Sequence, residues 1–281
     1  MGESGTILTS SDGTTWDNRT SGTSYRLYEV TYGNGTFVTV GRSGTILTSS
    51  DNGTSWDNRT SGTTENLYGV TYGNGLFVTG GYSGTILTSP DGTTWDNRTS
   101  GTLLVLIGVT YGNGTFVTVG QSGTILTSPD GTTWDNRTSA RSSDLYEVTY
   151  GNGLFVTVGK SGTILTSSDG TTWTERDSGI SERGKILSGV TYGNGLFVTV
   201  GDGTIRTSSD GISWTERTWG TTWNLYGVTY GNGLFVTVGG SGIYQFGIYS
   251  NSLVLTSSDG ISWTERTSGT SENLRGVLHS Q

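Results

Sequence analysis

The stretch "TSSDGTTWDNRT", residues 9–20, decides the fold, because near-copies of it return six more times along the chain. Each copy places an aspartate in a turn shortly before a tryptophan. Successive motif tryptophans are 39 to 49 residues apart, at Trp16, Trp56, Trp95, Trp134, Trp173, Trp214 and Trp263. A period near 40 residues that holds four short strands is typical of a β-propeller blade.

One repeat unit, residues 67–99, predicts the four strands of such a blade. The segments "LYGVTY" (67–72), "LFVTG" (76–80), "GTILTS" (84–89) and "TTWDNRT" (93–99) are taken here as strands A, B, C and D. An Asn-Gly pair precedes strand B and an Asp-Gly pair precedes strand D, as expected for tight hairpins. No segment has a helical period of useful length.

The sequence therefore predicts an all-β fold, a single seven-bladed propeller of four-stranded antiparallel blades over residues 1–281. The chain begins in a strand C and ends after a strand A, so the closing blade would be a composite of both ends. That unit has no "GNGLFVTVG" segment, and we expect it to lack strand B and to be incomplete. The expected blades span residues 27–60, 67–99, 106–138, 145–176, 187–217 and 225–267, with the composite formed by 274–281 and 1–20.

Composition excludes several classes of function. The net charge of −8 argues against nucleic acid as a partner. There is no cysteine, and therefore neither a disulfide framework nor a thiolate metal site. No apolar run has the length of a membrane span, so we expect no membrane insertion. The N-terminal segment lacks the features of a signal peptide. The compartment stays unknown, and the chain is interpreted either as a cytoplasmic protein or as a domain of an extracellular or surface protein.

The seven motif copies resemble the Asp-box, or BNR repeat, of sialidases, sortilin-like receptors and photosystem II assembly factors. In that family the box is the hairpin between the third and fourth strands of a propeller blade, which is where the repeat places it here. Seven in-phase copies make the resemblance specific for the fold.

We interpret the repeated aspartates as structural. An aspartate in a tight turn accepts hydrogen bonds from backbone N–H groups just ahead of it, and the tryptophan packs against the base of the hairpin. Catalysis by seven aspartates would need seven separate sets of partners. The structural aspartates are Asp12, Asp51, Asp91, Asp130, Asp169, Asp210 and Asp259, each paired with the motif tryptophan that follows it.

The sequence predicts neither a catalytic residue, nor a metal site, nor a cofactor. Sialidases, the nearest enzymes by motif, use three arginines for the substrate carboxylate, and no such triad can be assigned here. Seven of the fifteen basic residues stand at one repeated place in strand D and should pair with acids such as Asp17 or Glu175. The single histidine, His279, is expected to have a strand-end surface role. The recurring "GNG" lacks the lysine and helix of a phosphate loop and is a hairpin turn.

Differences among the copies fall mainly in the loops between strands B and C and between strands D and A, which share one face of a propeller. Loops on a rigid scaffold are where binding is usually placed. The candidate ligand-binding residues are the aromatic residues of these loops: Trp219, Trp223, Tyr244, Phe246, Tyr249, Tyr82 and Tyr25. Two interpretations stay open for the group at 219–249. It forms either an exposed patch or a small satellite core buried under the 241–253 insertion.

We therefore expect a non-enzymatic binding or scaffold propeller that binds a glycan or a protein on the face of these loops. The assembly factors that the chain resembles act as protein-binding chaperones. One alternative is a glycoside hydrolase of the sialidase kind. Another is a structural repeat domain of a larger surface protein, or an engineered or recently duplicated repeat protein. The sequence does not predict the oligomeric state.

Overall fold

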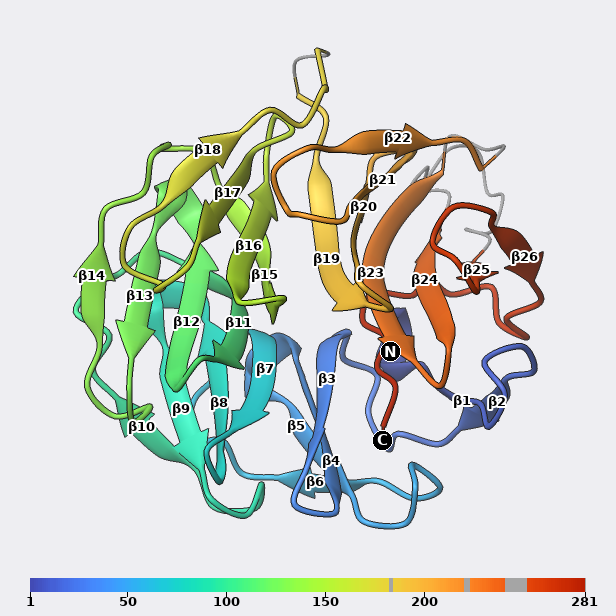
Figure 1. Ribbon diagram of the computed structural model, residues 1–281. Helices are drawn as coiled ribbons and strands as arrows, with labels where there is room; N and C mark the ends of the chain where they lie inside the picture. The colour runs from blue at the N-terminus through green and yellow to red at the C-terminus, as the bar shows by residue number, and fades with distance from the viewer. Residues whose placement is uncertain (182–183, 220–222, 241–251, 281) are drawn as a thin grey trace.

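The computed structural model describes residues 1–181, 184–219, 223–240 and 252–280. Six four-stranded antiparallel sheets stand around a common axis as the blades of a propeller (Figure 1). We number them blade 1 (β3–β6) to blade 6 (β23–β26) in chain order. The β-propeller with four-stranded blades is as the sequence predicted.

Each blade repeats the same strand order from the axis outward. The A strands are β3 (Leu27–Gly33), β7 (Leu67–Gly73), β11 (Leu106–Gly112), β15 (Leu145–Gly151), β19 (Leu187–Gly193) and β23 (Asn224–Gly231). The B strands are β4 (Thr36–Gly41), β8 (Leu76–Gly81), β12 (Thr115–Gly120), β16 (Leu154–Gly159), β20 (Leu196–Gly201) and β24 (Leu234–Gly240). The C strands are β5 (Ile46–Ser49), β9 (Ile86–Ser89), β13 (Ile125–Ser128), β17 (Ile164–Ser167), β21 (Thr204–Ser208) and β25 (Ser252–Ser257). The outer D strands are β6 (Asp57–Arg59), β10 (Asp96–Arg98), β14 (Asp135–Arg137), β18 (Thr174–Arg176), β22 (Thr215–Arg217) and β26 (Thr264–Arg266).

The prediction of seven blades is wrong, since the described residues form six. The first motif copy forms only a two-stranded sheet, β1 (Ile7–Thr9) with β2 (Asp17–Arg19), which we call the N-terminal ribbon. The repeat count overstated the number of blades because the motif marks only the hairpin between strands C and D. That hairpin folds here without strands A and B beside it in the same sheet.

The A–B hairpins follow from their Asn-Gly turns. Asn34 and Gly35 have φ angles of 48° and 76°, the left-handed values that a tight hairpin of this kind requires. At the other end of strand A the register shifts between Leu27 and Glu29, which makes Tyr28 the extra residue of a β-bulge. The same shift recurs in every blade, for instance between Leu145 and Glu147.

The core lies between consecutive blades. Val38, Val40 and Ile46 of blade 1 pack against Leu67 and Phe77 of blade 2, and equivalent clusters follow around the ring. Close packing also holds the inner strands together. A Cβ atom added to the glycine that ends β11, Gly112, would lie 2.2 Å from the Tyr150 ring of the next blade. Only a glycine leaves room for a ring this close to the backbone.

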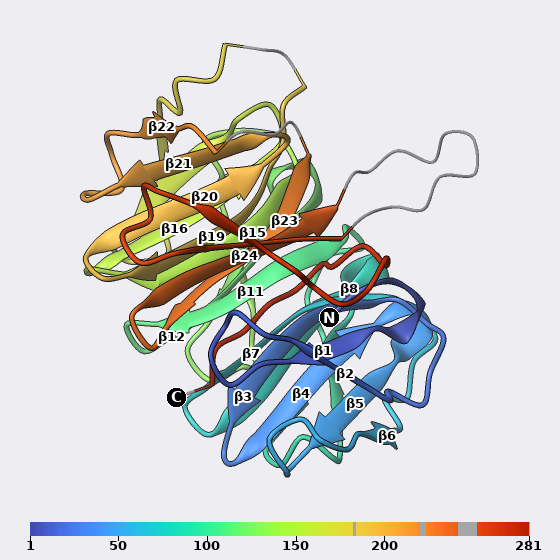
Figure 2. The same ribbon diagram turned by 90° about the vertical axis from the view of Figure 1, so that its right-hand side faces the viewer.

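The first residues of the chain pair with the segment near its C-terminal end, beside the N-terminal ribbon. Figures 1 and 2 show this side of the ring. Gly2 forms a β-bridge with Leu274, and the Arg275 N–H donates to the Met1 carbonyl oxygen at 2.7 Å. We call residues 274–280 the closing segment. It lies between the inner strands of blades 6 and 1, because a Cβ added to Gly227 would contact Arg275 and one added to Gly276 would contact Tyr28.

The remaining elements are four short 3-10 turns, one before β1 and three between strands B and C. They are η1 (Glu3–Gly5), η2 (Arg42–Gly44), η3 (Tyr82–Gly84) and η4 (Gln121–Gly123). Within the described part of the chain, no helix is long and apolar enough to span a membrane.

Candidate binding face

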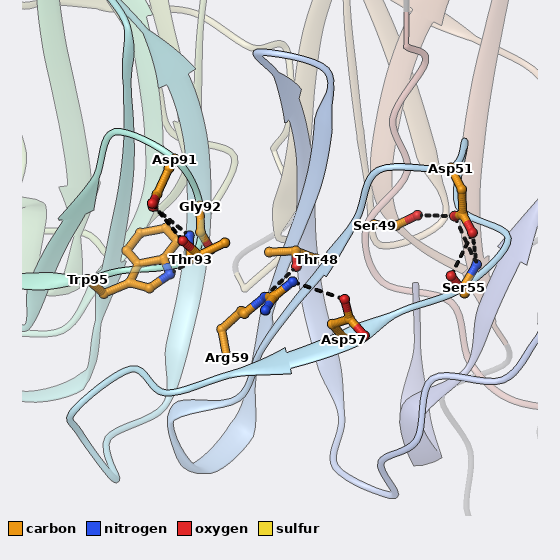
Figure 3. A network of polar contacts seen from close by, with 10 residues as sticks. All are labelled: Thr48, Ser49, Asp51, Ser55, Asp57, Arg59, Asp91, Gly92, Thr93 and Trp95. Atoms are coloured by element: carbon orange, nitrogen blue, oxygen red, sulfur yellow. Dashed lines mark hydrogen bonds and ion pairs between the residues drawn. The ribbon is translucent and has the colours of Figure 1, made fainter.

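Each motif aspartate accepts hydrogen bonds within its own hairpin, as Asp51 and Asp91 do in Figure 3. Asp91 Oδ1 accepts from the backbone N–H groups of Thr93 at 2.8 Å and Thr94 at 3.0 Å. Its other oxygen accepts from the Thr93 hydroxyl at 2.6 Å. The hydroxyl of Thr93 and the two backbone N–H groups hold the pKa of the Asp91 carboxyl well below its usual range. Trp95 Nε1 closes the hairpin by donating to the Gly92 carbonyl at 3.0 Å.

The strand D arginines are held in place by neighbouring side chains. Arg59 donates through Nε to Thr48 Oγ1 at 2.8 Å and through Nη2 to Asp57 Oδ2 at 3.0 Å (Figure 3). We predicted that strand D arginines pair with acids such as Asp17. The ion pair between Arg19 and Asp17, at 3.1 Å, confirms this. Glu175 instead pairs with Arg141, an arginine outside the repeated position.

The B–C loops and the D–A loops share one face, here called the loop face. The backbone N–H of Arg42 in η2 donates to the Arg26 carbonyl, which immediately precedes strand A of the same blade, at 2.9 Å. Asn66 then links two neighbouring loops. Its side-chain oxygen accepts from Ser43 N–H at 2.9 Å, and its carbonyl accepts from Tyr82 N–H at 2.8 Å. Hydrogen bonds therefore hold these loops together, and the Asn66 side chain links the loops of neighbouring blades.

The structure describes four of the seven predicted binding residues. Tyr25 and Tyr82 are 48% and 49% exposed on the loop face. Trp219 and Trp223 are half-buried and pack against the core cluster between blades 5 and 6. Three other candidates, Tyr244, Phe246 and Tyr249, lie outside the described residues.

The structure adds two candidates that sequence reasoning missed, Leu103 and Leu104, which are 86% and 38% exposed. They follow Thr102, whose carbonyl oxygen would lie 2.0 Å from a Cβ added to Gly84, so this D–A loop packs directly on the η3 loop that begins with Tyr82. The signal was present in the sequence, because residues 103–106 are "LLVL" where other copies have polar residues. We call Tyr25, Tyr82, Leu103 and Leu104 the loop-face patch.

A shallow cavity of about 810 Å³ lies beside Tyr25. Its walls are mostly hydroxyl and backbone groups of the η2 loop and of the following D–A loop, among them Ser43, Thr45 and Thr63, with Leu47 at its base. Exposed rings next to such polar walls give a surface that can hold apolar side chains and satisfy backbone groups of a bound chain.

Close to the loop face, the bulged residues at the start of the inner strands form an aromatic and charged cluster. The rings of Tyr28 and Tyr68 lie 5.0 Å apart, and the Arg275 guanidinium stands 4.1 Å over the Tyr226 ring. Glu3 pairs with Arg26 and, at 2.9 Å, with Arg275. The charges of Glu3, Arg26 and Arg275 are therefore paired with one another in this cluster.

Two glutamates of the inner strands were also missed by sequence reasoning. Burial is the main cause that raises the pKa of Glu29 to about 7, and it raises the pKa of Glu147 well above its usual value. Charge repulsion from Glu29 adds to the shift of Glu147. The signal was again a departure from the repeat, "LYEV" in place of "LYGV" at residues 27–30 and 145–148.

His279 has a packing role in the closing segment. A Cβ added to Gly231 would lie 1.8 Å from His279 Cδ2, so this imidazole takes the place that a tyrosine ring has in the other inner strands. The prediction of a surface role was therefore incomplete, since the ring is half-buried. Among the described residues, no three histidine, aspartate or glutamate side chains are grouped as a metal site would require.

Comparisons with known proteins agree with the fold. Residues 142–274 match the model of the DUF6242 beta propeller domain. The chain is similar to the solved structure of YCF48 bound to D1 peptide, with 19% identity, a TM-score of 0.67, and coverage of 84% of this chain and 83% of that chain. YCF48 from Cyanidioschyzon merolae gives 16% identity, a TM-score of 0.64, and coverage of 84% and 86%. The WD40 β-propeller domain of Doa1 gives 16% identity, a TM-score of 0.66, and coverage of 84% and 83%. No curated protein matches the chain.

Proposed function

We propose that the chain is a non-enzymatic binding module that holds a segment of a partner protein on its loop face. The observation that carries this proposal is the loop-face patch. Four of the six large hydrophobic side chains exposed in the described structure belong to it, on loops fixed by backbone contacts. Exposed apolar side chains gathered on a rigid scaffold are typical of protein interaction sites.

The choice of a protein ligand over a glycan rests on chemistry and on similarity. Leu103 and Leu104 offer aliphatic surface, which suits apolar side chains better than sugar hydroxyls. YCF48, a structural neighbour, has been solved with a bound peptide. We also propose that the C–D hairpins are Asp-boxes, a view supported by the repeated hydrogen bonds of the motif aspartates.

The experiment is selection of binding peptides from a random display library with the wild-type chain, followed by affinity measurements on variants. The double variant Tyr82→Ser with Leu103→Ser should bind the selected peptides at least about tenfold more weakly, because both side chains would lie in the contact. The matched control is Ile212→Ser with Ile261→Ser, two large hydrophobic residues that are 48% and 46% exposed on C–D hairpins at the opposite face.

Equal weakening by both double variants would contradict the proposed site. Failure to select any peptide, together with glycan-array binding that the Tyr82→Ser and Leu103→Ser pair abolishes, would contradict the proposed ligand class. Turnover of a fluorogenic sialoside by the wild-type chain would contradict the non-enzymatic assignment.

A further inference from the structure

The B–C loop of blade 1 lies between two exposed rings of the loop-face patch. Its first residue, Arg42, donates its backbone N–H to the carbonyl of the residue after Tyr25 at 2.9 Å. Its second residue, Ser43, donates to the Asn66 side chain at 2.9 Å, and the Asn66 carbonyl accepts from Tyr82 N–H at 2.8 Å. Along the loop face, Arg42 is therefore placed between Tyr25 and Tyr82.

Arg42 differs from the other arginines that the structure describes. Each of the others donates at least one hydrogen bond from its guanidinium, as Arg59 does to Thr48. The Arg42 side chain is exposed and has no hydrogen bond, ion pair or ring contact with any described residue. Its guanidinium is thus available to a group from another molecule.

The backbone of Arg42 is held firmly although its side chain is not. Thr45 donates to the Arg42 carbonyl twice, from its backbone N–H at 3.2 Å and from its hydroxyl at 2.7 Å. The same η2 turn is tied to Asn66 through Ser43. A guanidinium on a fixed backbone loses less freedom when it binds an anion, and its planar N–H groups match a carboxylate.

The neighbouring charges leave Arg42 as an exposed cation without a partner. Arg26, the next cation on this side of the face, is paired with Glu3. Glu65, on the D–A loop after blade 1, is half-buried and forms no ion pair with Arg42 or with any other described residue. A bound segment would therefore meet one exposed guanidinium and one less exposed carboxylate at this place.

The cavity beside Tyr25 directs a bound segment across Arg42. Ser43, the residue after Arg42, lines this cavity of about 810 Å³. Its volume is in the range of pockets that hold ligand groups. Tyr82 and Leu103 lie further along the face, so a segment with one apolar side chain at the cavity and another on Tyr82 has to pass over Arg42.

Covering Arg42 has a cost that only certain segments offset. A segment that shields the guanidinium from water without giving it an acceptor removes hydrogen bonds to solvent and replaces none of them. An aspartate or glutamate in the segment would restore these bonds with a charged acceptor. Tyrosine and arginine are also the residue types that contribute most to binding energy in protein interfaces.

We propose that the protein segment bound at the loop face carries an aspartate or glutamate that pairs with Arg42, flanked by apolar side chains that contact Tyr25 and Tyr82. This inference rests on the proposed function, because it specifies the segment that the loop-face patch binds. The net charge of −8 disfavours acidic segments at long range, so a preference for one has to come from the local guanidinium.

The test uses three displayed libraries of short peptides that differ only in the central residue, which is acidic, a neutral amide, or basic. Panning against the full chain should enrich the acidic library, with apolar residues on both sides of the centre. The most enriched acidic peptide is then synthesised together with a copy whose central carboxylate is replaced by its amide. Fluorescence anisotropy should show that the amide copy binds wild type about fivefold to tenfold more weakly.

Variants assign this preference to one side chain. Arg42→Ala should bind the acidic peptide as weakly as wild type binds the amide copy, and it should not distinguish the two peptides. Arg42→Glu should instead prefer a copy with lysine at the centre. Lys160→Ala, which removes an exposed cation at the same position of the B–C loop of blade 4, is the control and should change neither affinity.

The outcomes separate this inference from the proposed function. Suppose that Tyr82→Ser with Leu103→Ser weakens binding, but that wild type binds the acid and the amide equally, or that Arg42→Ala still prefers the acid. The inference is then overturned and the proposed function stands. Enrichment of the basic library would also overturn the inference, since Glu65 would be the group recognised. If no library yields a peptide, or if the patch variant binds as wild type does, the proposed function fails and the inference fails with it.

Discussion

A single carboxylate fixes each hairpin between strands C and D. Asp91 accepts hydrogen bonds from two backbone N–H groups that would otherwise be left to solvent in the turn. The Ser89 hydroxyl donates a third hydrogen bond to it at 3.0 Å. Hydrogen bonds to a charged acceptor are stronger than those between neutral groups. Both oxygens of Asp91 are thus engaged by local structure, which favours a structural role for the repeated aspartate.

Replacement of this carboxylate should destabilise the fold without changing binding. We expect Asp91→Ala to lower the free energy of unfolding by about 1–3 kcal/mol, since it leaves the N–H groups of Thr93 and Thr94 without their acceptor. Asp91→Asn keeps one acceptor oxygen and should cost less. Urea unfolding measures both variants. An alanine variant as stable as wild type, or one that loses binding while fully folded, would contradict the structural role.

At the scale of the element, glycines that end strand A determine how closely blades approach. Gly112 lies directly beneath the ring of Tyr150, whereas Gly114, two residues further in the turn, has open space around its Cα and a φ of 75°. The first glycine is required by packing and the second by backbone conformation. The two requirements have different energetic costs.

The pair Gly112→Ala and Gly114→Ala separates these costs. Gly114→Ala should lower stability by about 1 kcal/mol, the strain of a left-handed alanine. Gly112→Ala must displace the Tyr150 ring or the adjoining strand and should cost more, about 1–3 kcal/mol or above. Thermal unfolding of the two variants gives the order. The reverse order would mean that contacts between inner strands are looser than the structure indicates.

The strands could be predicted from sequence because their signals are local and repeat in phase. The alternation in "LYGVTY", the Asn-Gly turns and the Asp-Gly turns each specify one hairpin. The number of blades could not be predicted in this way. A C–D hairpin such as 7–19 has the same kind of sequence whether or not strands A and B complete its sheet. The partial burial of Trp219 and the exposed fraction of Leu103 could not be predicted either, although "LLVL" marks an apolar loop, since both depend on which loops pack together.

At the scale of the whole molecule, buried charge couples strands that are far apart in the ring. Glu29 on β3 and Glu147 on β15 both have raised pKa values, and charge repulsion from Glu29 adds to the shift of Glu147. A raised pKa means that the folded state keeps its proton longer than the unfolded state does. The protonated glutamates therefore contribute their full stabilisation of the fold below the unfolded pKa, about 4.5. That stabilisation is lost as the pH rises through the folded pKa, which is about 7 for Glu29.

Glu147→Gln should show this linkage. The amide cannot ionise, and it can still accept the hydrogen bond that Val148 N–H donates to Glu147 Oε1 at 2.9 Å. We expect wild type and variant to have similar stability at pH 4, with the variant gaining about 1 kcal/mol relative to wild type by pH 8. Glu265→Gln, an exposed change on β26, is the control. A difference that does not change with pH would refute the coupling.

The position of Met1 has a practical consequence for recombinant work. Its amino group donates to the Gly276 carbonyl at 2.9 Å, so an affinity tag fused ahead of Met1 would place extra residues beside the closing segment. Such a tag should disturb this contact and alter Tm by itself. Protein for binding measurements is better made with a removable tag after the C-terminus, and the two tag positions should not be treated as interchangeable.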